Sequence, residues 1–288
     1  MWRTIFPDQE NPVDRHQWNI GSVVPRPIAW ITTLNEDDSV NIAPFSFFNA
    51  FSSHPPVVAV GIALKPDGTK KDTLINIERT KEFVVNVVSE DLLYPMALTS
   101  QPFPYGVSEV EKAGLTLIPS EKLKTPRVKE SPINIECELL EVKQLSDRNF
   151  MVIGKVVAWH IREDMLFKGK RPDPRLIKPV ARMGRLWYAT INESNVLEVP
   201  VPNGLGVGIN ALPDFIKHST ILTLNQKSLL AMETSIPTEE PATKGIVEVI
   251  MRSDNAMHEI QKYIADLINQ RNIQEAWKVI KFVEKLMN

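Results

Sequence analysis

Residues suited to bind a flat ligand gather between Pro25 and Pro56. Within this segment, residues 41–52 read NIAPFSFFNAFS, with four phenylalanines, two serines and one proline. A slot for a flat aromatic ligand needs apolar walls, a few polar groups and backbone amides on an irregular strand. The same composition is typical of a barrel core with an edge bulge at Pro44, so composition alone leaves both interpretations open.

A second candidate site lies at residues 68–77, GTKKDTLINI, where two lysines precede a short helical run. Lysine charges, a threonine hydroxyl and the N-terminal amides of a helix together form a phosphate site. Alternatively, Asp72 is a plain N-cap and the lysines lie in solvent.

The motifs of several common chemistries are absent from the sequence. There is no P-loop, no G-x-G-x-x-G after a predicted strand, no G-x-S-x-G and no H-E-x-x-H. The five histidines are scattered without a pair at ligand spacing, so no metal site is predicted. The single cysteine, Cys137, excludes an intrachain disulfide framework and a multi-cysteine zinc site.

The elements that would position these residues are mainly strands in the first 200 residues. Eighteen of the 22 prolines lie there, too many for a series of long helices. Apolar or alternating runs predict strands at 23–34, 56–64, 82–88, 133–142 and 150–161, and short helices at 73–79, 92–99 and 107–113. No regular helix follows each strand, which favours an antiparallel barrel over a doubly wound parallel sheet.

The last third of the chain predicts an α-helical extension. Asn255 is a candidate N-cap, and apolar residues recur every three or four positions at 257–268 and 273–283, with a break near 269–272. Such a stripe suits a packing appendage, and it suits a dimerisation element or a lid as well.

The whole composition is that of a soluble globular protein, with 43% hydrophobic and 24% charged residues. A formal net charge of −2 gives no electrostatic case for a nucleic-acid partner or an anionic membrane. No run approaches the roughly 18 apolar residues of a transmembrane helix, and the first ten residues lack the apolar region of a signal peptide. These features predict a cytoplasmic protein.

Several segments occur together in one known family. In order, PRPIAWI (25–31), NIAPFSFFN (41–49), KDTLINI (71–77), EFVVNV (82–87) and GKVVAWHI (154–161) closely resemble the flavin reductase-like, FMN-binding split-barrel family, in its flavoredoxin-like branch. The resemblance runs from about Trp18 to Tyr188. It implies a fold that is mainly β with helices: a Greek-key split β-barrel at residues 1–202, followed by the C-terminal α-helical extension at 203–288. It also implies a homodimer that holds non-covalent FMN near the dimer interface.

The resemblance implies which residues hold FMN. The stretch along the flavin ring is matched by Ala43, Pro44, Phe45, Ser46, Phe47 and Phe48, whose backbone amides would meet the pyrimidine edge. The neighbouring strand is matched by Trp30, Thr32 and Thr33. The segment near the ribityl phosphate is matched by Lys71, Asp72, Thr73 and Asn76. Arg26 is either a second phosphate partner or a surface arginine, and His160 is either a nicotinamide contact or a rim histidine.

The function implied by the resemblance is that of an FMN-dependent oxidoreductase of the flavin reductase type. It would pass electrons from NADH or NADPH through FMN to a flavin, a metal complex or a small organic acceptor, with the chemistry carried by FMN and not by a catalytic side chain. Related reductases often have an Asp-His pair where this chain has Asp147-Arg148-Asn149. This departure supports an alternative, an FMN-binding electron carrier without its own NAD(P)H site. A third alternative is a binding scaffold without FMN, against which the intact KDTxxN and APFSFF segments count.

The extension lies outside the resemblance, because members of the family end soon after the motif that here reads ARMGRLWY (181–188). The loop at 203–208 has three glycines in six residues and is flexible enough to let the extension reach away from the barrel. We expect the extension to dock on the barrel dimer, with residues 209–235 nearest the flavin entrance.

Overall fold

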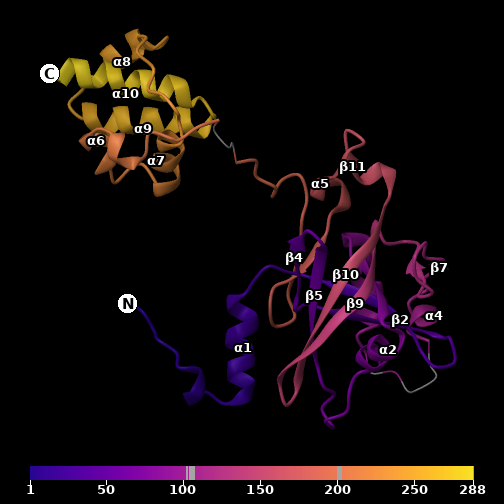
Figure 1. Cartoon of the computed structure of the whole chain (residues 1–288). Coiled ribbons are helices and arrows are strands. Elements are labelled where there is room, and N and C mark those ends of the chain that lie inside the picture. Colours follow the sequence, from indigo (N-terminus) through magenta and orange to yellow (C-terminus); the bar gives the residue numbers. More distant parts are fainter. Residues whose placement is uncertain (102, 104–107, 200–202, 288) are drawn as a thin grey trace. The chain divides into compact units, whose positions relative to one another are not determined.

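The computed structural model describes residues 1–101, 103, 108–199 and 203–287 (Figure 1). The chain divides into two units, Met1–Leu197 and Glu198–Asn288, each with a core of its own. The boundary predicted after residue 202 lies outside the described residues and stays a prediction. The docking expected for residues 209–235 also stays a prediction. The first residue of the helix predicted at 107–113 also lies outside them.

The first unit is built mainly from strands (Figure 1). The strands are β1 (Arg26–Pro27), β2 (Ala29–Leu34), β3 (Val40–Phe45), β4 (Phe48–Ser53), β5 (Pro56–Ala63), β6 (Glu82–Val87), β7 (Leu117–Ile118), β8 (Arg127–Val128), β9 (Ile133–Ser146), β10 (Asn149–Ile161), β11 (Leu166–Phe167), β12 (Arg171–Pro172), β13 (Val180–Arg182) and β14 (Tyr188–Thr190). The α-helices are α1 (Pro12–Ser22), α2 (Asp72–Thr80), α3 (Leu93–Leu98), α4 (Glu109–Lys112) and α5 (Pro174–Ile177).

Seven strands form one antiparallel sheet in the order β3-β2-β6-β9-β10-β5-β4. Its outermost strands, β3 and β4, follow each other in sequence, with only Ser46 and Phe47 between them. The sheet therefore curls until its two edges approach at this connection, where the Gly61 amide donates a hydrogen bond to the Phe47 carbonyl (2.7 Å). The barrel stays split because β3 pairs with β2 whereas β4 pairs with β5. The predicted fold class, a mainly β split barrel with a helical extension, is confirmed.

The barrel interior is filled by alternate residues of its strands. On β2, Ala29 and Ile31 belong to the interior cluster, whereas Trp30 belongs to a second core that includes Met96 of α3 and Val110 of α4. Helix α2 packs against β2 and adds its buried face to the interior. The period of two along β2 thus divides its side chains between two different environments.

The predicted strands at 56–64, 82–88, 133–142 and 150–161 correspond to β5, β6, β9 and β10. Strand β9 continues to Ser146 because it pairs with β10 over its whole length. The strand predicted at 23–34 starts later, at Arg26, because the chain before it is the helix α1. Helix α1 has no apolar stripe from which the sequence could have predicted it, because Ile20 is the one buried residue of its eleven.

The second unit is α-helical, as predicted for the extension. Its helices are α6 (Asp214–Lys217), α7 (Leu224–Ala231), α8 (Lys244–Ile250), α9 (Ala256–Asn269) and α10 (Ile273–Met287). Asn255 occupies the N-cap position of α9, and the predicted break separates α9 from α10. Trp277 of α10 is fully buried, and its indole N–H donates to the carbonyl of Leu230 (2.9 Å). This unit therefore has a core that could hold it together without the barrel.

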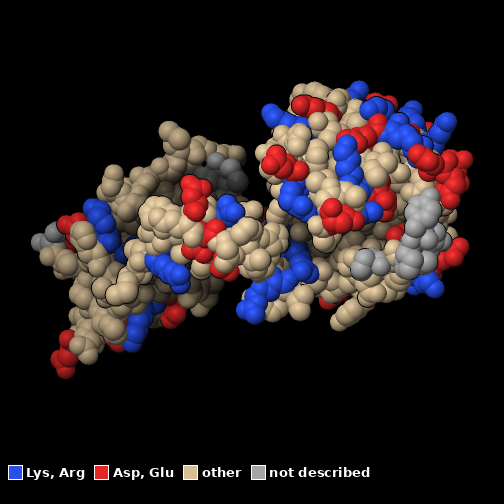
Figure 2. Space-filling view, turned by 90° about the horizontal axis from the view of Figure 1, so that it is seen from below, with Lys and Arg blue, Asp and Glu red and all other residues tan. Residues whose placement is uncertain are grey.

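The surface carries charges of both signs. On the face seen in Figure 2, lysines and arginines are interspersed with aspartates and glutamates over both units. Among the described residues, no helix is both long enough and apolar enough to cross a membrane.

Replacing Trp277 with Ala should lower the melting temperature of the second unit and leave that of the barrel unchanged. The substitution removes a fully buried side chain and leaves the Leu230 carbonyl without its donor, which should cost about 3–5 kcal/mol. Differential scanning calorimetry would follow the two transitions. The matched variant Phe83→Ala, in the barrel interior, should lower only the other transition. A common shift of both transitions in either variant would show that the units unfold as one.

Candidate functional site

Two cavities flank the connection between β3 and β4. The first, which we call the Lys71 cavity, has a volume of about 470 Å³. It is lined by Asn41–Pro44, Lys65–Asp67, Lys71–Thr73, Thr99–Gln101, Phe103 and Glu109. The second, the Arg26 cavity, has a volume of about 380 Å³. It is lined by Asn19, Val23, Pro25–Pro27, Ser46–Asn49, Phe51, Ala59, Gly61, Leu145 and Met151.

The Lys71 cavity opens over the N-terminus of α2. Lys71 is the N-cap residue of this helix, and its ammonium lies 5.6 Å from the centre of the Phe45 ring. Lys65 forms an ion pair with Asp72 at 3.0 Å, so one lysine of the rim is partly neutralised. The N-terminal amides of α2 and the charge of Lys71 favour an anion at this end of the cavity, which Asp67, Asp72 and Glu109 also line.

A buried network of amides and hydroxyls supports the cavity from below. The side-chain amide of Asn41 donates to the hydroxyls of Thr33 (3.1 Å) and Thr73 (3.0 Å). The amide of Asn76 donates to Thr33 (3.1 Å) and to the side-chain oxygen of Asn35 (2.7 Å). The structure thus brings together three residues singled out from the sequence, Thr33, Thr73 and Asn76. It adds Asn41, which lies in the quoted NIAPFSFFN motif but was not chosen.

Glu109 is a lining residue that sequence reasoning missed. It is half-buried at the start of α4 and shares the Lys71 cavity with Asp72. Its burial and then the negative charge of Asp72 raise the pKa of Glu109 above its ordinary value. The cavity therefore contains a carboxyl that gives up its proton less readily than usual. No local motif marks Glu109, because its neighbours in the cavity are distant in sequence.

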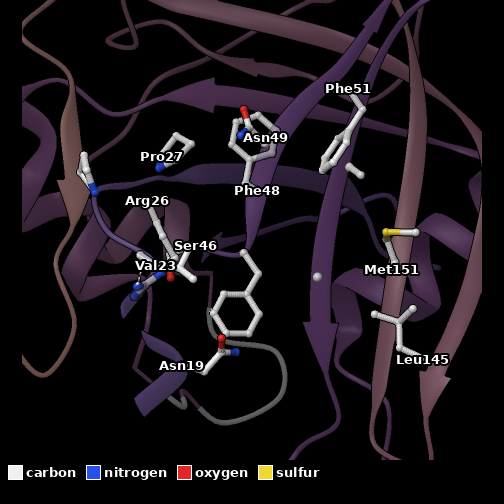
Figure 3. Close-up of a pocket in the computed structure, with 14 residues that line it drawn as sticks. Asn19, Val23, Arg26, Pro27, Ser46, Phe48, Asn49, Phe51, Leu145 and Met151 are labelled. Atoms are coloured by element: carbon white, nitrogen blue, oxygen red, sulfur yellow. Dashed lines mark hydrogen bonds between the residues drawn. The ribbon is translucent and has the colours of Figure 1, made fainter. Parts of the chain in front are cut away.

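The Arg26 cavity has apolar walls (Figure 3). Phe47 and Phe51 are 41% and 67% exposed, so both rings present open faces to solvent or to a ligand. Phe45, two residues before Phe47, points instead into the barrel interior. The residues of the Ala43–Phe48 stretch, predicted to run along a flavin ring, therefore lie at two cavities. Ala43 and Pro44 line the Lys71 cavity, and Ser46–Phe48 line the Arg26 cavity.

Arg26 is buried and ends helix α1. One of its terminal nitrogens, Nη1, donates to the carbonyls of Ile20 (2.5 Å) and Val23 (2.8 Å), which are free at the C-terminus of α1. The guanidinium also lies over the Phe47 ring, 5.8 Å from its centre. Burial and then the charge of Arg182 lower the pKa of Arg26. Arg26 and Lys71 line different cavities, so the structure does not bring them to one phosphate.

Trp30 and Thr32 line neither of the two cavities. The Trp30 indole donates to the hydroxyl of Thr99 (2.9 Å), and the Thr32 hydroxyl donates to the carbonyl of Pro126 (2.7 Å). Both side chains are fully buried, and neither is among the lining residues of the two cavities. Successive side chains of β2 point to opposite faces, so Trp30 and Thr32 lie on the face opposite to Thr33. A direct contact of all three residues with one ligand stays a prediction, and this geometry does not favour it.

His160 is held by a buried carboxylate. Its Nε2 lies 2.5 Å from Oε1 of Glu136, which is fully buried and also accepts hydrogen bonds from the amides of Glu121 and Lys122 (both 2.8 Å). Burial alone would raise the pKa of Glu136, but the hydrogen bonds from the Glu121 amide, His160 and the Lys122 amide outweigh it and lower that pKa. His160 thus has a structural partner, and its nicotinamide contact stays a prediction.

The described residues contain no group of three or more histidine, cysteine, aspartate or glutamate side chains that could hold a metal ion. The chemical groups that gather around the β3–β4 connection are instead lysine, arginine, amides, hydroxyls and phenyl rings, together with the carboxyl groups of Asp67, Asp72 and Glu109. Such groups suit an anionic, aromatic organic ligand.

Known proteins similar to this chain match its first unit. An uncharacterized protein of Aquifex aeolicus is 39% identical over 169 residues, which are 59% of this chain and 86% of that protein. The crystal structure of nitrilotriacetate monooxygenase component B from Bacillus cereus has 33% identity and a TM-score of 0.64, covering 68% of this chain and 99% of that one. The structure of Pseudomonas fluorescens 2-nitrobenzoate 2-nitroreductase has 33% identity and a TM-score of 0.63, covering 70% and 97%.

The family described as flavin reductase like domain matches residues 20–175. This range includes both cavities except for Asn19, and it ends before the helical unit begins. The match covers more than half of the chain and agrees with the split barrel seen here. The chain belongs to the flavin reductase-like family of split-barrel proteins.

Proposed function

We propose that the protein is an FMN-dependent oxidoreductase of the flavin reductase type. The observation that carries the proposal is the Lys71 cavity, which sets the N-terminus of α2 and Lys71 beside Ala43 and Pro44, the first two residues of the stretch expected along the flavin ring. Two similar structures are by name a monooxygenase component and a nitroreductase, which supports an oxidoreductase.

The phosphate of FMN would lie at the N-terminus of α2. Lys71 would supply charge, and the first-turn amides of the helix would donate hydrogen bonds. The Thr73 hydroxyl would donate as well, because its oxygen accepts from Asn41 and its own proton is not used there. Asn41 donates to the hydroxyls of Thr73 and Thr33, and Asn76 donates to the same Thr33 hydroxyl and so holds it in place. The sequence has no dinucleotide fingerprint, so one terminal phosphate, as in FMN, fits better than the diphosphate of FAD.

The flavin ring would extend from this cavity along β3 toward Ser46. Backbone amides of the edge strand face that side, since β3 pairs with β2 on its other side. Bound FMN would supply the redox chemistry, taking electrons from a reduced nicotinamide and passing them to a flavin, a metal complex or a small organic acceptor. The side chains would position the cofactor and exclude water.

An FMN-binding electron carrier without its own NAD(P)H site is the second candidate. Arg148, which stands where related reductases carry a histidine, donates to the carbonyl of Lys65 (2.7 Å) and so ties the β9–β10 turn to the rim of the Lys71 cavity. His160 is engaged by Glu136. Anaerobic mixing of the FMN-loaded protein with NADH or NADPH separates the candidates. Loss of the oxidised-flavin absorbance supports the reductase, and an unchanged spectrum supports the carrier.

We also propose that the protein works as a homodimer. Strand β4 is an edge strand whose residues 49–53 are all exposed. The unpaired backbone of an exposed edge strand is a surface with which a second copy of the chain would pair. A single species of about the monomer mass of 32.6 kDa in light scattering of the FMN-loaded protein would contradict a dimer.

Replacing Lys71 with Ala should weaken FMN binding about 10- to 100-fold, the scale of a hydrogen bond to a charged group. Riboflavin, which has no phosphate, should bind the variant as well as the wild type. Quenching of flavin fluorescence measures both affinities. Lys70→Ala is the matched control, because Lys70 pairs with Glu78 (2.6 Å) and does not line the cavity. Equal losses for FMN and riboflavin would place the phosphate elsewhere.

Replacing Glu109 with Gln should tighten FMN binding several-fold at neutral pH. Glu109 shares the cavity with Lys65, Asp67, Lys71 and Asp72, and its ionised carboxylate repels a phosphate. Because the pKa of Glu109 is raised, wild-type affinity should fall as the pH rises through that value, and wild type and variant should converge at lower pH.

The ratio of the two affinities at each pH cancels the titration of the FMN phosphate itself. Glu111→Gln, an exposed position on the same short helix, is the control and should behave as wild type. A pH-independent ratio between Glu109→Gln and wild type would rule out this effect of the Glu109 charge.

A further inference from the structure

Arg26 is a buried cation without a counter-ion. Its residue is 5% exposed, and no ion pair joins it to a carboxylate among the described residues. The neighbouring charge that acts on it most is Arg182, another cation. A buried charge without an opposite charge is strongly destabilising, so a site of this kind calls for an anion.

One edge of the guanidinium has no hydrogen-bond partner among the described residues. Nη1 is used by the carbonyls of Ile20 and Val23, which leaves the edge formed by Nε and Nη2. Within the part of the chain that the structure describes, Nε of Arg26 is the one buried side-chain nitrogen or oxygen atom without a hydrogen-bond partner. Two parallel N–H groups on this edge match the two oxygens of a carboxylate.

Apart from Arg26, the lining of the cavity is mostly apolar, with Asn19, Ser46 and Asn49 as its other polar side chains. Its volume of about 380 Å³ lies within the usual range for small-ligand sites. In Figure 3, Phe51, Met151 and Leu145 lie across the cavity from Arg26. Phe47 lies beneath the guanidinium, so one wall of the cavity already holds a phenyl ring beside the charge.

We propose that the Arg26 cavity binds a planar aromatic carboxylate of about the size of benzoate. The carboxylate would accept hydrogen bonds from the Nε–Nη2 edge of Arg26, and the ring would lie among Phe47, Phe48 and Phe51. The cavity adjoins Ser46, at the end of the stretch proposed for the flavin ring. This step rests on the proposed function, under which the Arg26 cavity is the site of the organic substrate.

A phosphate group fits the cavity less well than a carboxylate. The Lys71 cavity offers two lysines, a threonine hydroxyl and the N-terminus of α2, whereas the Arg26 cavity offers one guanidinium edge and phenyl walls. A small inorganic anion would leave these walls exposed to water. The combination selects an anion that carries an apolar, flat body.

Calorimetric titration of the FMN-loaded protein with benzoate, benzamide and inorganic phosphate tests the proposal. Benzoate should bind at least about tenfold more tightly than benzamide, which lacks the charge, and than phosphate, which lacks the ring. Arg26→Lys keeps a donor for the carbonyls of Ile20 and Val23 but loses the two-pronged edge, and it should weaken benzoate binding about tenfold. Phe51→Ala should weaken benzoate binding several-fold, and it does not touch the hydrogen bonds of Arg26 to the end of α1. Arg185→Gln, an exposed position, is the control.

Several results would overturn the proposal: no heat with benzoate, equal binding of benzamide, or wild-type affinity in Phe51→Ala. Phe51→Ala decides the matter if Arg26→Lys does not fold. Competition between FMN and benzoate would show that the flavin itself occupies the cavity, and would also overturn it. Failure to take up FMN would contradict the proposed function alone, because benzoate can be titrated into the protein without it.

Discussion

The two residues that join β3 to β4 constrain the whole first unit. In a flat sheet of seven strands, the outer two would lie about 29 Å apart, at about 4.8 Å for each of six spacings. The step from Phe45 to Phe48 spans three residues and so reaches at most about 11 Å. The sheet must therefore curl, and the closure brings β3, β4 and the loops beside them to one place. Both cavities lie beside the β3–β4 connection because the curvature of the sheet brings its two edge strands together at that point.

The connection also divides the chemistry of the site. On one side, the N-terminus of α2 meets the exposed edge of β3, and lysines and hydroxyls gather around it. On the other side, α1 and β4 enclose phenyl rings and one arginine. A ligand that extends from the first cavity along the edge of β3 toward Ser46 would meet phosphate-binding groups first and the unpaired backbone of a strand edge next, which is the order of the parts of FMN. The phenyl rings of the second cavity remain for a separate aromatic ligand.

The strands were predictable because burial imposes their patterns locally. Ile135, Cys137 and Leu139 share a face of β9 in a run that alternates with polar residues, and β5 is a short apolar run between turns. The residues of the site were less predictable. The motif places Trp30, Thr32 and Thr33 together in sequence, yet a strand turns successive side chains to opposite faces.

Residues recruited by tertiary structure had no local signal at all. Glu109 enters the Lys71 cavity from α4, which is more than thirty residues away from Asp72 in sequence. The role of Arg26 depends on the end of α1, a helix with almost no buried face. In both cases the sequence shows the charged residue and not what surrounds it, because the surroundings come from chain closure.

Two of the buried charged residues of the barrel unit, Glu136 and Arg26, differ in whether the fold supplies their hydrogen-bond partners. Glu136 is fully buried, yet the amides of Glu121 and Lys122 and the ring of His160 surround its carboxylate with donors. Its charge is compensated within the fold, so it can hold the loop at Glu121 and His160 in place without any ligand. Arg26 is as deeply buried, but its donors exceed the acceptors that the fold provides. Among the described residues, every other buried side-chain nitrogen or oxygen atom has a hydrogen-bond partner, so the Nε of Arg26 stands out as a donor that a ligand would have to satisfy.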